Sequence, residues 1–406
     1  MLSGFRQCLT FAALLVPAIA SAAGELPETR DLERVGLVNA WWGRAVVDSK
    51  QDEIEFLLPD EQHVIAQSRQ GLITAFRADT GSVEWAVLLG GPSVRAFPAV
   101  MNEREVILAI GLNMFSLDKR TGETLWQLRL PNHPSCTPDV DANQVYVGTV
   151  DGSVYAYDLG RIRDLFSERK LPAYTHLALM WRYKTPKEII SIISDGKSVD
   201  FVSQIGSLYG VDARERRLRF QLETDAPVDT PLGRNPDSLF LTSRDARMLC
   251  MNAANGKLRW IFTAGTPIVR QPRIVGDYVY VTPSQVGLFS LDAKDGGEQW
   301  RQPHAAEFLA ATDTRIYGFD TVGNLVSIDR SNGRITSRLP LREFSVHGPN
   351  ELTDRLYVST PNGLVACFRE QVQTLPIFHR NPERRPILPE LAPEKPAGAP
   401  AETPAN

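Results

Sequence analysis

The stretch LDKRTGETLW, from Leu117 to Trp126, returns along the chain in recognisable form. MNAANGKLRW runs from Met251 to Trp260, and LDAKDGGEQW runs from Leu291 to Trp300. In each copy a polar residue is followed by Gly four positions later and by Trp eight positions later. A phrase that recurs with fixed internal spacing is the signature of a repeat architecture.

The polar position of the phrase defines eight units with a period near 40 residues. Intervals run from 37 to 41 residues, apart from one of 54 between Asp158 and Asp212. The long interval indicates extra chain in the third unit, about one helix and a loop. The eight positions are Arg77, Asp118, Asp158, Asp212, Asn252, Asp292, Asp329 and Phe368.

Gly and a large aromatic residue recur at set distances behind this position. The polar residue caps its own turn, and the Gly supplies a positive φ for the chain reversal. The aromatic residue stands on the strand that follows, where we expect it to fill the space between neighbouring units. The glycines are Gly81, Gly122, Gly256, Gly296 and Gly333, and the aromatic residues are Trp85, Trp126, Trp181, Phe220, Trp260 and Trp300.

Each unit also contains a β-hairpin signal. NQVYVGTVDGSVYAYD, from Asn143 to Asp158, alternates apolar and small or polar residues on both sides of an Asp-Gly turn. A short upstream segment supplies an inner strand, and the phrase itself leads into an outer strand. The sequence therefore predicts an all-β fold, a single eight-bladed β-propeller of four-stranded antiparallel blades.

The eighth unit ends at Phe368 without a Gly or Trp behind it. GLVNAWWGRAV, from Gly36 to Val47, resembles the missing outer strand, so we expect an N-terminal strand to close the ring. The predicted organisation is a linker over 23–35, a propeller over 36–370 and a disordered tail over 371–406. The tail is rich in Pro and Ala and cannot bury enough apolar surface to fold.

The N-terminus has the form of a secretory leader. Arg6 precedes a twelve-residue apolar stretch that is too short to span a bilayer, and ASA at 20–22 fits a cleavage site. No Cys stands at the cleavage point, so we expect an exported periplasmic or secreted protein without a lipid anchor. We expect no transmembrane segment in the mature chain.

The net charge and the cysteine content argue against two classes of protein, nucleic-acid-binding proteins and disulfide-stabilised proteins. The formal net charge is −4, which offers no electrostatic footprint for nucleic acid. Three cysteines remain after the leader, Cys136, Cys250 and Cys367, and this odd, sparse number argues against a disulfide framework. We expect them to be small apolar core residues in a monomer.

The repeat phrase resembles the tryptophan-docking motif of the quinoprotein-like β-propeller family. SLDKRTGETLW, from Ser116 to Trp126, is similar to it at nearly every position, and the likeness extends over about residues 36–370. Within that family the chain looks most like the outer-membrane assembly proteins. The resemblance implies an envelope protein that holds other envelope proteins together, including the outer-membrane assembly machinery, without catalysis.

Two other functions stay open. The same family includes dehydrogenases that depend on pyrroloquinoline quinone, which need a metal held by oxygen ligands and often a vicinal disulfide. This chain has no Cys-Cys pair, and its recurring Asp residues fit turn caps better than converging ligands. We therefore expect no catalytic residue, no cofactor and no metal. The third possibility is a periplasmic propeller that binds a small ligand in its central funnel.

The extra chain in the third unit is the candidate docking site. LGRIRDLFSERKLPAYTHLALMW, from Leu159 to Trp181, lies between the third and outer strands and contains helical spacing. The equivalent loop of the next unit, DARERRLRF from Asp212 to Phe220, is also basic. We predict one raised basic patch that binds an acidic protein partner. Its residues are Arg161, Arg163, Phe166, Arg169, Lys170, Arg214, Arg216 and Arg217.

Overall fold

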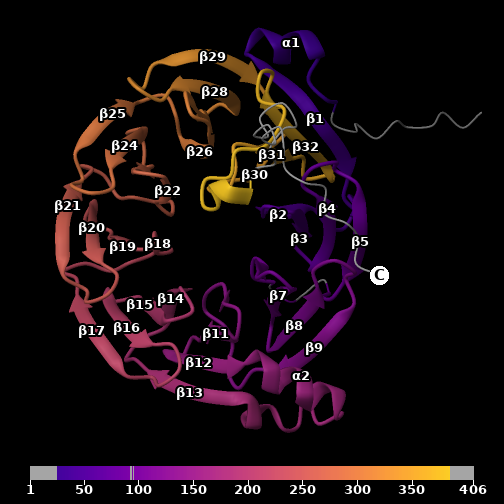
Figure 1. Ribbon diagram of the computed structural model, residues 1–406, viewed down its shortest axis with the longest axis vertical. Helices are drawn as coiled ribbons and strands as arrows, with labels where there is room; N and C mark the ends of the chain where they lie inside the picture. The colour runs from indigo at the N-terminus through magenta and orange to yellow at the C-terminus, as the bar shows by residue number, and fades with distance from the viewer. Residues whose placement is uncertain (1–24, 92–93, 95, 385–406) are drawn as a thin grey trace, which may run out of the picture.

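Eight antiparallel sheets of four strands each surround a central opening in the computed structural model, which describes residues 25–91, 94 and 96–384 (Figure 1). We number the blades in chain order and give their strands from the opening outward. Blades one to four are β2 (Ile54–Pro59), β3 (His63–Ser68), β4 (Leu72–Arg77), β5 (Val83–Leu88); β6 (Val100–Met101), β7 (Glu105–Ile110), β8 (Asn113–Asp118), β9 (Thr124–Arg129); β10 (Asp139–Val140), β11 (Gln144–Gly148), β12 (Ser153–Asp158), β13 (Leu179–Lys184); and β14 (Ile189–Ser194), β15 (Ser198–Ser203), β16 (Ser207–Asp212), β17 (Leu218–Glu223). Blades five to eight are β18 (Gly233–Arg234), β19 (Ser238–Thr242), β20 (Arg247–Asn252), β21 (Leu258–Thr263); β22 (Arg273–Val275), β23 (Tyr278–Val281), β24 (Leu288–Asp292), β25 (Glu298–Gln302); β26 (Glu307–Ala311), β27 (Arg315–Phe319), β28 (Asn324–Asp329), β29 (Ile335–Pro340); and β30 (Val346–Gly348), β31 (Leu356–Ser359), β32 (Leu364–Glu370), β1 (Leu37–Arg44).

Burial differs between the middle and the rim of each blade. Every residue of β3 and of β15 is buried, because blades cover these strands on both sides. The outer strand β5 buries Trp85 alone and exposes most of its other residues. Middle strands therefore consist mainly of β-branched and aromatic residues, whereas rim strands combine one large aromatic residue with polar neighbours.

An N-terminal strand closes the ring, as the sequence predicted. β1 pairs antiparallel with β32, from Leu37 opposite Glu370 to Arg44 opposite Leu364, so the first described strand completes the last blade. Figure 1 shows β1 beside β32, where the first and last described strands meet. The closure removes an unpaired sheet edge from the protein.

The repeat phrase forms the contact between neighbouring blades. Trp85 Nε1 donates to the carbonyl of Lys119 in the next blade at 3.0 Å. The Trp85 ring lies on Gly122, where an added Cβ would come within 2.6 Å of it, and the φ of Gly122 is +73°. Gly is thus required both for the turn and for the close approach of the ring. The same pairing of ring and glycine joins Trp41 to Gly81, Phe220 to Gly256, Trp260 to Gly296 and Trp300 to Gly333.

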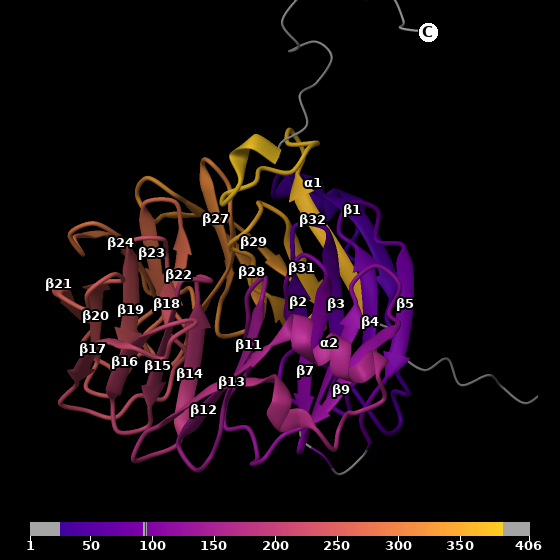
Figure 2. The same ribbon diagram turned by 60° about the horizontal axis from the view of Figure 1, so that its bottom comes forward.

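Segments before β1 and after β32 extend the ring. The span predicted as a linker contains α1 (Thr29–Arg34), which buries Leu32 against blades seven and eight. Where the disordered tail was expected to begin, residues 371–384 make defined contacts with the ring, and they include the 3-10 helix η2 (Pro382–Arg384). We call residues 371–384 the strap; it rises above the ring in Figure 2. The predicted leader over 1–22 and the tail beyond residue 384 lie outside the described residues.

Candidate functional site

The insertion of blade three lies on the rim of the ring, between β12 and β13. It contains α2 (Leu159–Ser167) and the 3-10 helix η1 (Thr175–Ala178). Asp158 caps α2 by accepting a hydrogen bond from the backbone N–H of Arg161 at 2.7 Å. In blade two the equivalent Asp118 accepts from the amides of its own turn. The same polar position therefore begins a helix here because the chain behind it is longer.

A buried carboxylate ties α2 to blade two. Trp126 meets the insertion where other blades present a turn glycine, and its Nε1 donates to Glu105 Oε2 at 3.1 Å. Arg163 Nε donates to the other oxygen of Glu105 at 2.6 Å, and Ser116 Oγ donates to Oε2 at 2.8 Å. The Glu105 side chain is fully buried. Arg163, predicted as a docking cation, is thus engaged in holding the insertion to the ring.

The remaining predicted docking residues form two groups. Arg161 and Phe166 are exposed on α2, and Arg169 and Lys170 are exposed directly behind it. Arg214, Arg216 and Arg217 are exposed in the turn between β16 and β17. α2 packs against β9, whereas the turn packs against β13, where Trp181 Nε1 donates to Ala213. Their union into one docking patch remains a prediction.

Arg216 occupies the place that glycine takes in five other blades. It stands four residues after Asp212 and has a φ of +58°, a left-handed conformation that glycine adopts more readily. Its Nη1 donates to the carbonyl of Arg182 in blade three at 3.0 Å. The guanidinium group thus lies along the outer strand of the preceding blade.

The insertion also exposes large apolar side chains. Phe166 is 37% exposed, Tyr174 49%, Leu177 47% and Met180 40%. α2 is buried through Leu159, Ile162 and Leu165, which join the core between blades two and three. The insertion is therefore anchored to the ring and also exposes apolar side chains and cations. We call this surface, made of Phe166, Tyr174, Leu177, Met180, Arg161, Arg169 and Lys170, the insertion surface.

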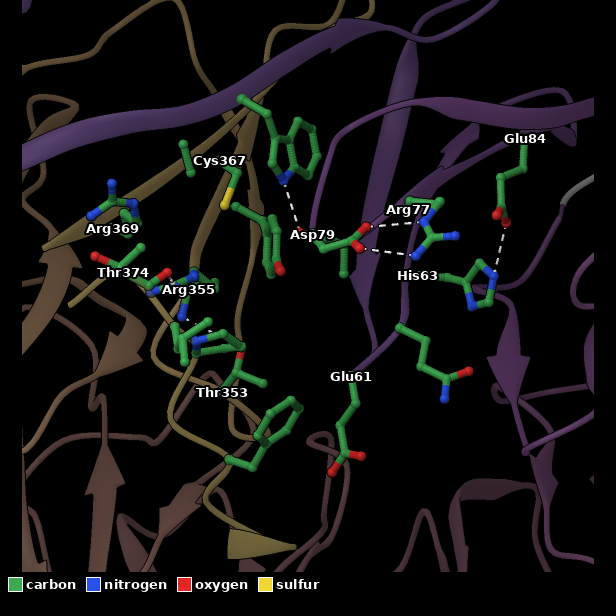
Figure 3. Close-up of a pocket in the computed structure, with 18 of the residues that line it drawn as sticks. Glu61, His63, Arg77, Asp79, Glu84, Thr353, Arg355, Cys367, Arg369 and Thr374 are labelled. Atoms are coloured by element: carbon green, nitrogen blue, oxygen red, sulfur yellow. Dashed lines mark hydrogen bonds and ion pairs between the residues drawn. The ribbon is translucent and has the colours of Figure 1, made fainter. Parts of the chain in front are cut away.

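A cavity of about 690 Å³ lies at the seam between blades eight and one, and we call it the seam cavity (Figure 3). Trp41, Tyr357 and Cys367 lie at its base, where Trp41 Nε1 donates to Ala78 at 2.8 Å. The strap forms part of the wall through Leu375, Pro376 and Phe378, among others. Turns of blade one supply the wall opposite the strap.

Each of the three carboxylates that line the seam cavity has a partner. Arg77 donates two hydrogen bonds to Asp79, of 3.0 and 2.9 Å. These hydrogen bonds help to hold the pKa of Asp79 below its usual value. The other two carboxylates also have partners, as His63 Nε2 lies 2.9 Å from Glu84 and Asn381 donates to Glu61 at 2.7 Å.

Arginines line the seam cavity at both ends of its span. Arg369 comes from blade eight and donates from Nη1 to the carbonyls of Glu370 and Gln371 at 3.0 and 3.3 Å. Arg120 comes from the turn of blade two. Within the described part of the chain, neither guanidinium group forms an ion pair with a carboxylate. Arg120 and Arg369 thus place a positive charge at each end of the cavity, without a carboxylate partner in that part of the chain.

The base of the cavity offers no activated nucleophile. Burial raises the pKa of the Cys367 thiol to about 12 and raises the pKa of the Tyr357 hydroxyl well above its ordinary value. Both groups therefore stay protonated at neutral pH, and a protonated thiol is a weak nucleophile. The arrangement of cations over an apolar base suits binding of an anionic partner.

Three further findings concern the described residues as a whole. Within 25–91, 94 and 96–384 there is no group of three or more His, Cys, Asp or Glu side chains placed to hold a metal ion. Among the helices in these ranges, none has the length and apolar character needed to cross a membrane. Cys136, Cys250 and Cys367 are free and buried.

Trp41 and the seam cavity were not predicted from the sequence. Trp41 occupies on β1 the docking position that Trp85 occupies on β5, and it packs on Gly81. A signal was present, because Gly81 is a turn glycine that needs an aromatic residue from the preceding blade, and in a closed ring that blade is the eighth. The cavity depends on the path of the strap, for which the sequence carries no pattern.

Comparison with known proteins identifies related chains. A family model described as outer membrane protein assembly factor BamB matches residues 69–227 and 204–355. The outer membrane protein assembly factor BamB of Shewanella oneidensis is 23% identical over 318 residues, which cover 75% of this chain and 67% of that protein.

Solved structures show the same fold at lower identity. The crystal structure of BamB from Moraxella catarrhalis superposes with a TM-score of 0.64 at 15% identity, covering 83% of this chain and 98% of that one. A computationally designed protein, Ika8, superposes with a TM-score of 0.63 at 12% identity, covering 82% and 99% of the two chains. At these identities the likeness concerns the fold alone.

Proposed function

The chain belongs to the family of the outer membrane protein assembly factor BamB, and we propose that it is a non-catalytic scaffold of the cell envelope that binds a protein partner. The leader predicted over residues 1–22 would export it to the periplasm. The outer-membrane assembly machinery is the partner that the names of its relatives suggest.

The observation that carries the proposal is the insertion surface. Large exposed apolar side chains in one region of a surface are a common feature of protein–protein interaction sites. Four of them lie between Phe166 and Met180, with Arg161 and Arg169 nearby. Buried apolar contacts would supply affinity, and the cations would steer an acidic partner to the surface.

Anchoring of the insertion also supports the proposal. A docking element binds more tightly when it is ordered before the partner arrives, because less conformational entropy is lost on association. Leu159, Ile162 and Leu165 are fully buried against blades two and three, and Arg163 contacts Glu105. The insertion is therefore held in place while its apolar side chains remain accessible.

A capture experiment with matched variants tests this function. The mature chain is immobilised and exposed to an envelope extract, and the bound subunits of the outer-membrane assembly machinery are identified by mass spectrometry. Tyr174→Ser combined with Leu177→Ser should abolish their capture. A control pair, Val83→Ser with Leu88→Ser, removes apolar side chains from the rim strand β5, which are 47% and 60% exposed, and should leave capture unchanged.

The charged contribution is tested separately. Arg161→Glu with Arg169→Glu should reduce capture, and the reduction should be smaller at high salt because exposed charges are screened. Arg214→Glu with Arg217→Glu asks whether the turn of blade four belongs to the same docking patch. Unchanged capture by folded variants of the insertion surface would refute the assignment of the docking site.

A further inference from the structure

The seam cavity has an extended shape that crosses three blades. Its lining runs from Arg369 and Thr353 in blade eight, past Asp79 in blade one, to Arg120 in the turn of blade two. Figure 3 shows Arg369 and Glu84 on opposite sides of the view, with the Arg77–Asp79 pair between them. A ligand that touches both ends of this cavity must itself be extended.

The strap, which forms one wall of the cavity, is held by groups of blade eight. Arg355 donates to the carbonyls of Gln373 and Thr374 at 3.3 and 2.7 Å, and Phe378 pairs with Thr353 in an antiparallel bridge. Asp354 accepts from the backbone N–H of Ile377 at 2.9 Å. Side-chain and backbone groups of blade eight thus recognise polypeptide backbone along one wall of the seam cavity.

Apolar side chains line the cavity at its base and along the strap. Trp41, Pro376 and Phe378 present apolar surface to the cavity. Arg120 and Arg369 contribute positive charge, and neither forms an ion pair with a carboxylate among the described residues. Extended peptides, especially those with proline, pack well on aromatic surfaces, and arginine binds carboxylates with charge-assisted hydrogen bonds.

From this geometry we infer that the seam cavity binds an extended acidic segment of a partner polypeptide, with carboxylates at its two ends near Arg369 and Arg120. The central residues of the segment lie over Trp41 and beside the strap. This site goes beyond the docking at the insertion surface, which lies on blade three. The two sites would give the scaffold two separate contacts with its clients.

A defined peptide pair tests the inference on the full mature chain. Fluorescein-labelled EPLPE is titrated and its fluorescence anisotropy measured, and QPLPQ, which has the same length and shape without the two carboxylates, serves as the matched peptide. EPLPE should bind saturably, and QPLPQ should bind about tenfold more weakly or worse. Binding of EPLPE should weaken as salt rises.

Variants of the protein locate the binding. Arg120→Gln and Arg369→Gln should each weaken binding of EPLPE about tenfold. Arg338→Gln, which changes an exposed arginine on the rim strand β29, should bind as the unaltered chain does. Because Arg369 also holds the strap, the melting temperature of each variant is recorded; Arg120 has no such contact and carries the test if the Arg369 variant unfolds.

The remaining possible outcomes of these experiments would contradict the inference. Equal affinity for EPLPE and QPLPQ, no saturable binding, or full binding by the folded Arg120→Gln variant would exclude recognition of an acidic segment here. Competition by adipate at the affinity of the peptide would assign the cavity to small dicarboxylates instead. Tyr174→Ser with Leu177→Ser should bind EPLPE normally, so failure at the insertion surface and failure at the seam cavity are distinguishable.

Discussion

Arg163 donates from Nε to Oε1 of Glu105 at 2.6 Å, and this contact ties the insertion of blade three to the second strand of blade two. In five other blades a turn glycine receives the aromatic ring of the preceding blade. Here Glu105 replaces that arrangement by accepting from Trp126 as well. One carboxylate thus allows the ring to carry an added helix without losing the contact between two blades.

Replacing Glu105 by Ala should lower the free energy of unfolding by about 2–4 kcal/mol, because Trp126, Ser116 and Arg163 all lose their acceptor. Urea-induced unfolding measures the change. Glu123→Ala, on the exposed turn of the same blade, should change it by less than about 0.5 kcal/mol. Equal effects of the two substitutions would show that the Glu105 contact contributes nothing to stability.

Trp41→Ala should destabilise the ring by about 3–5 kcal/mol, the usual cost of removing a buried Trp side chain. Trp41 is 7% exposed and packs on Gly81, whereas its neighbour Trp42 is 55% exposed. Trp42→Ala on the same strand is therefore the control, and it should cost much less. Thermal unfolding followed by circular dichroism compares the stabilities of the two variants. Similar losses of stability would mean that Trp41 does not stabilise the contact between blades eight and one.

Arg216→Gly should raise stability by about 0.5–1 kcal/mol, because glycine adopts the left-handed conformation of this position without a steric cost. The hydrogen bond to the carbonyl of Arg182 is exposed, so its loss offsets only part of the gain. Arg217→Gly, one residue further on and outside the left-handed region, should be neutral or destabilising. Chemical denaturation measures the free energy of unfolding of each variant. Higher stability for Arg217→Gly alone would show that the left-handed conformation of Arg216 carries no steric cost.

Asp139 makes the stability depend on pH. Burial of its carboxyl group raises the pKa of Asp139 to about 7, although the backbone N–H of Ser194 donates to it. In the unfolded chain the pKa returns to about 3.9, so the folded state holds one more proton between about pH 4 and pH 7. Its contribution to stability is therefore present at low pH and is lost as the pH rises to 7.

Asp139→Asn should remove this dependence. At pH 8 the variant should exceed the unaltered protein by about 1–3 kcal/mol in free energy of unfolding, and the difference should vanish near pH 4. Denaturation at several pH values tests the prediction, with the exposed Asp313→Asn as the control for a changed surface charge. A constant difference across the range would show that Asp139 does not titrate as the structure implies.

Much of the fold followed from the spacing of a few residues. Gly122 and Trp85 obey a local rule, since the turn needs a positive φ and the strand needs one large side chain, and both demands repeat with the blade. The number of blades and the closing strand came from counting units and noticing that one unit was short. The helix in the insertion followed from the spacing of Ile162 and Leu165, both fully buried.

The candidate sites were less accessible to prediction. Its positive charge within the insertion suggested that Arg163 was a docking residue. The sequence does not show that Glu105 is buried in the neighbouring blade and contacts Arg163. The strap was taken for the start of a disordered tail, because its order depends on Asp354 and Arg355, which lie about twenty residues earlier and bind its backbone.

The sequence by itself determined the blades, because turn chemistry and strand alternation act within a few residues and repeat with the period of the chain. Only the tertiary structure decided what happens where the repeat breaks. At the insertion, Glu105 and Arg163 meet across two blades, and at the seam, Arg120, Arg369 and the strap line one cavity. Such contacts join residues that are distant in sequence and depend on three-dimensional packing, so no local pattern specifies them.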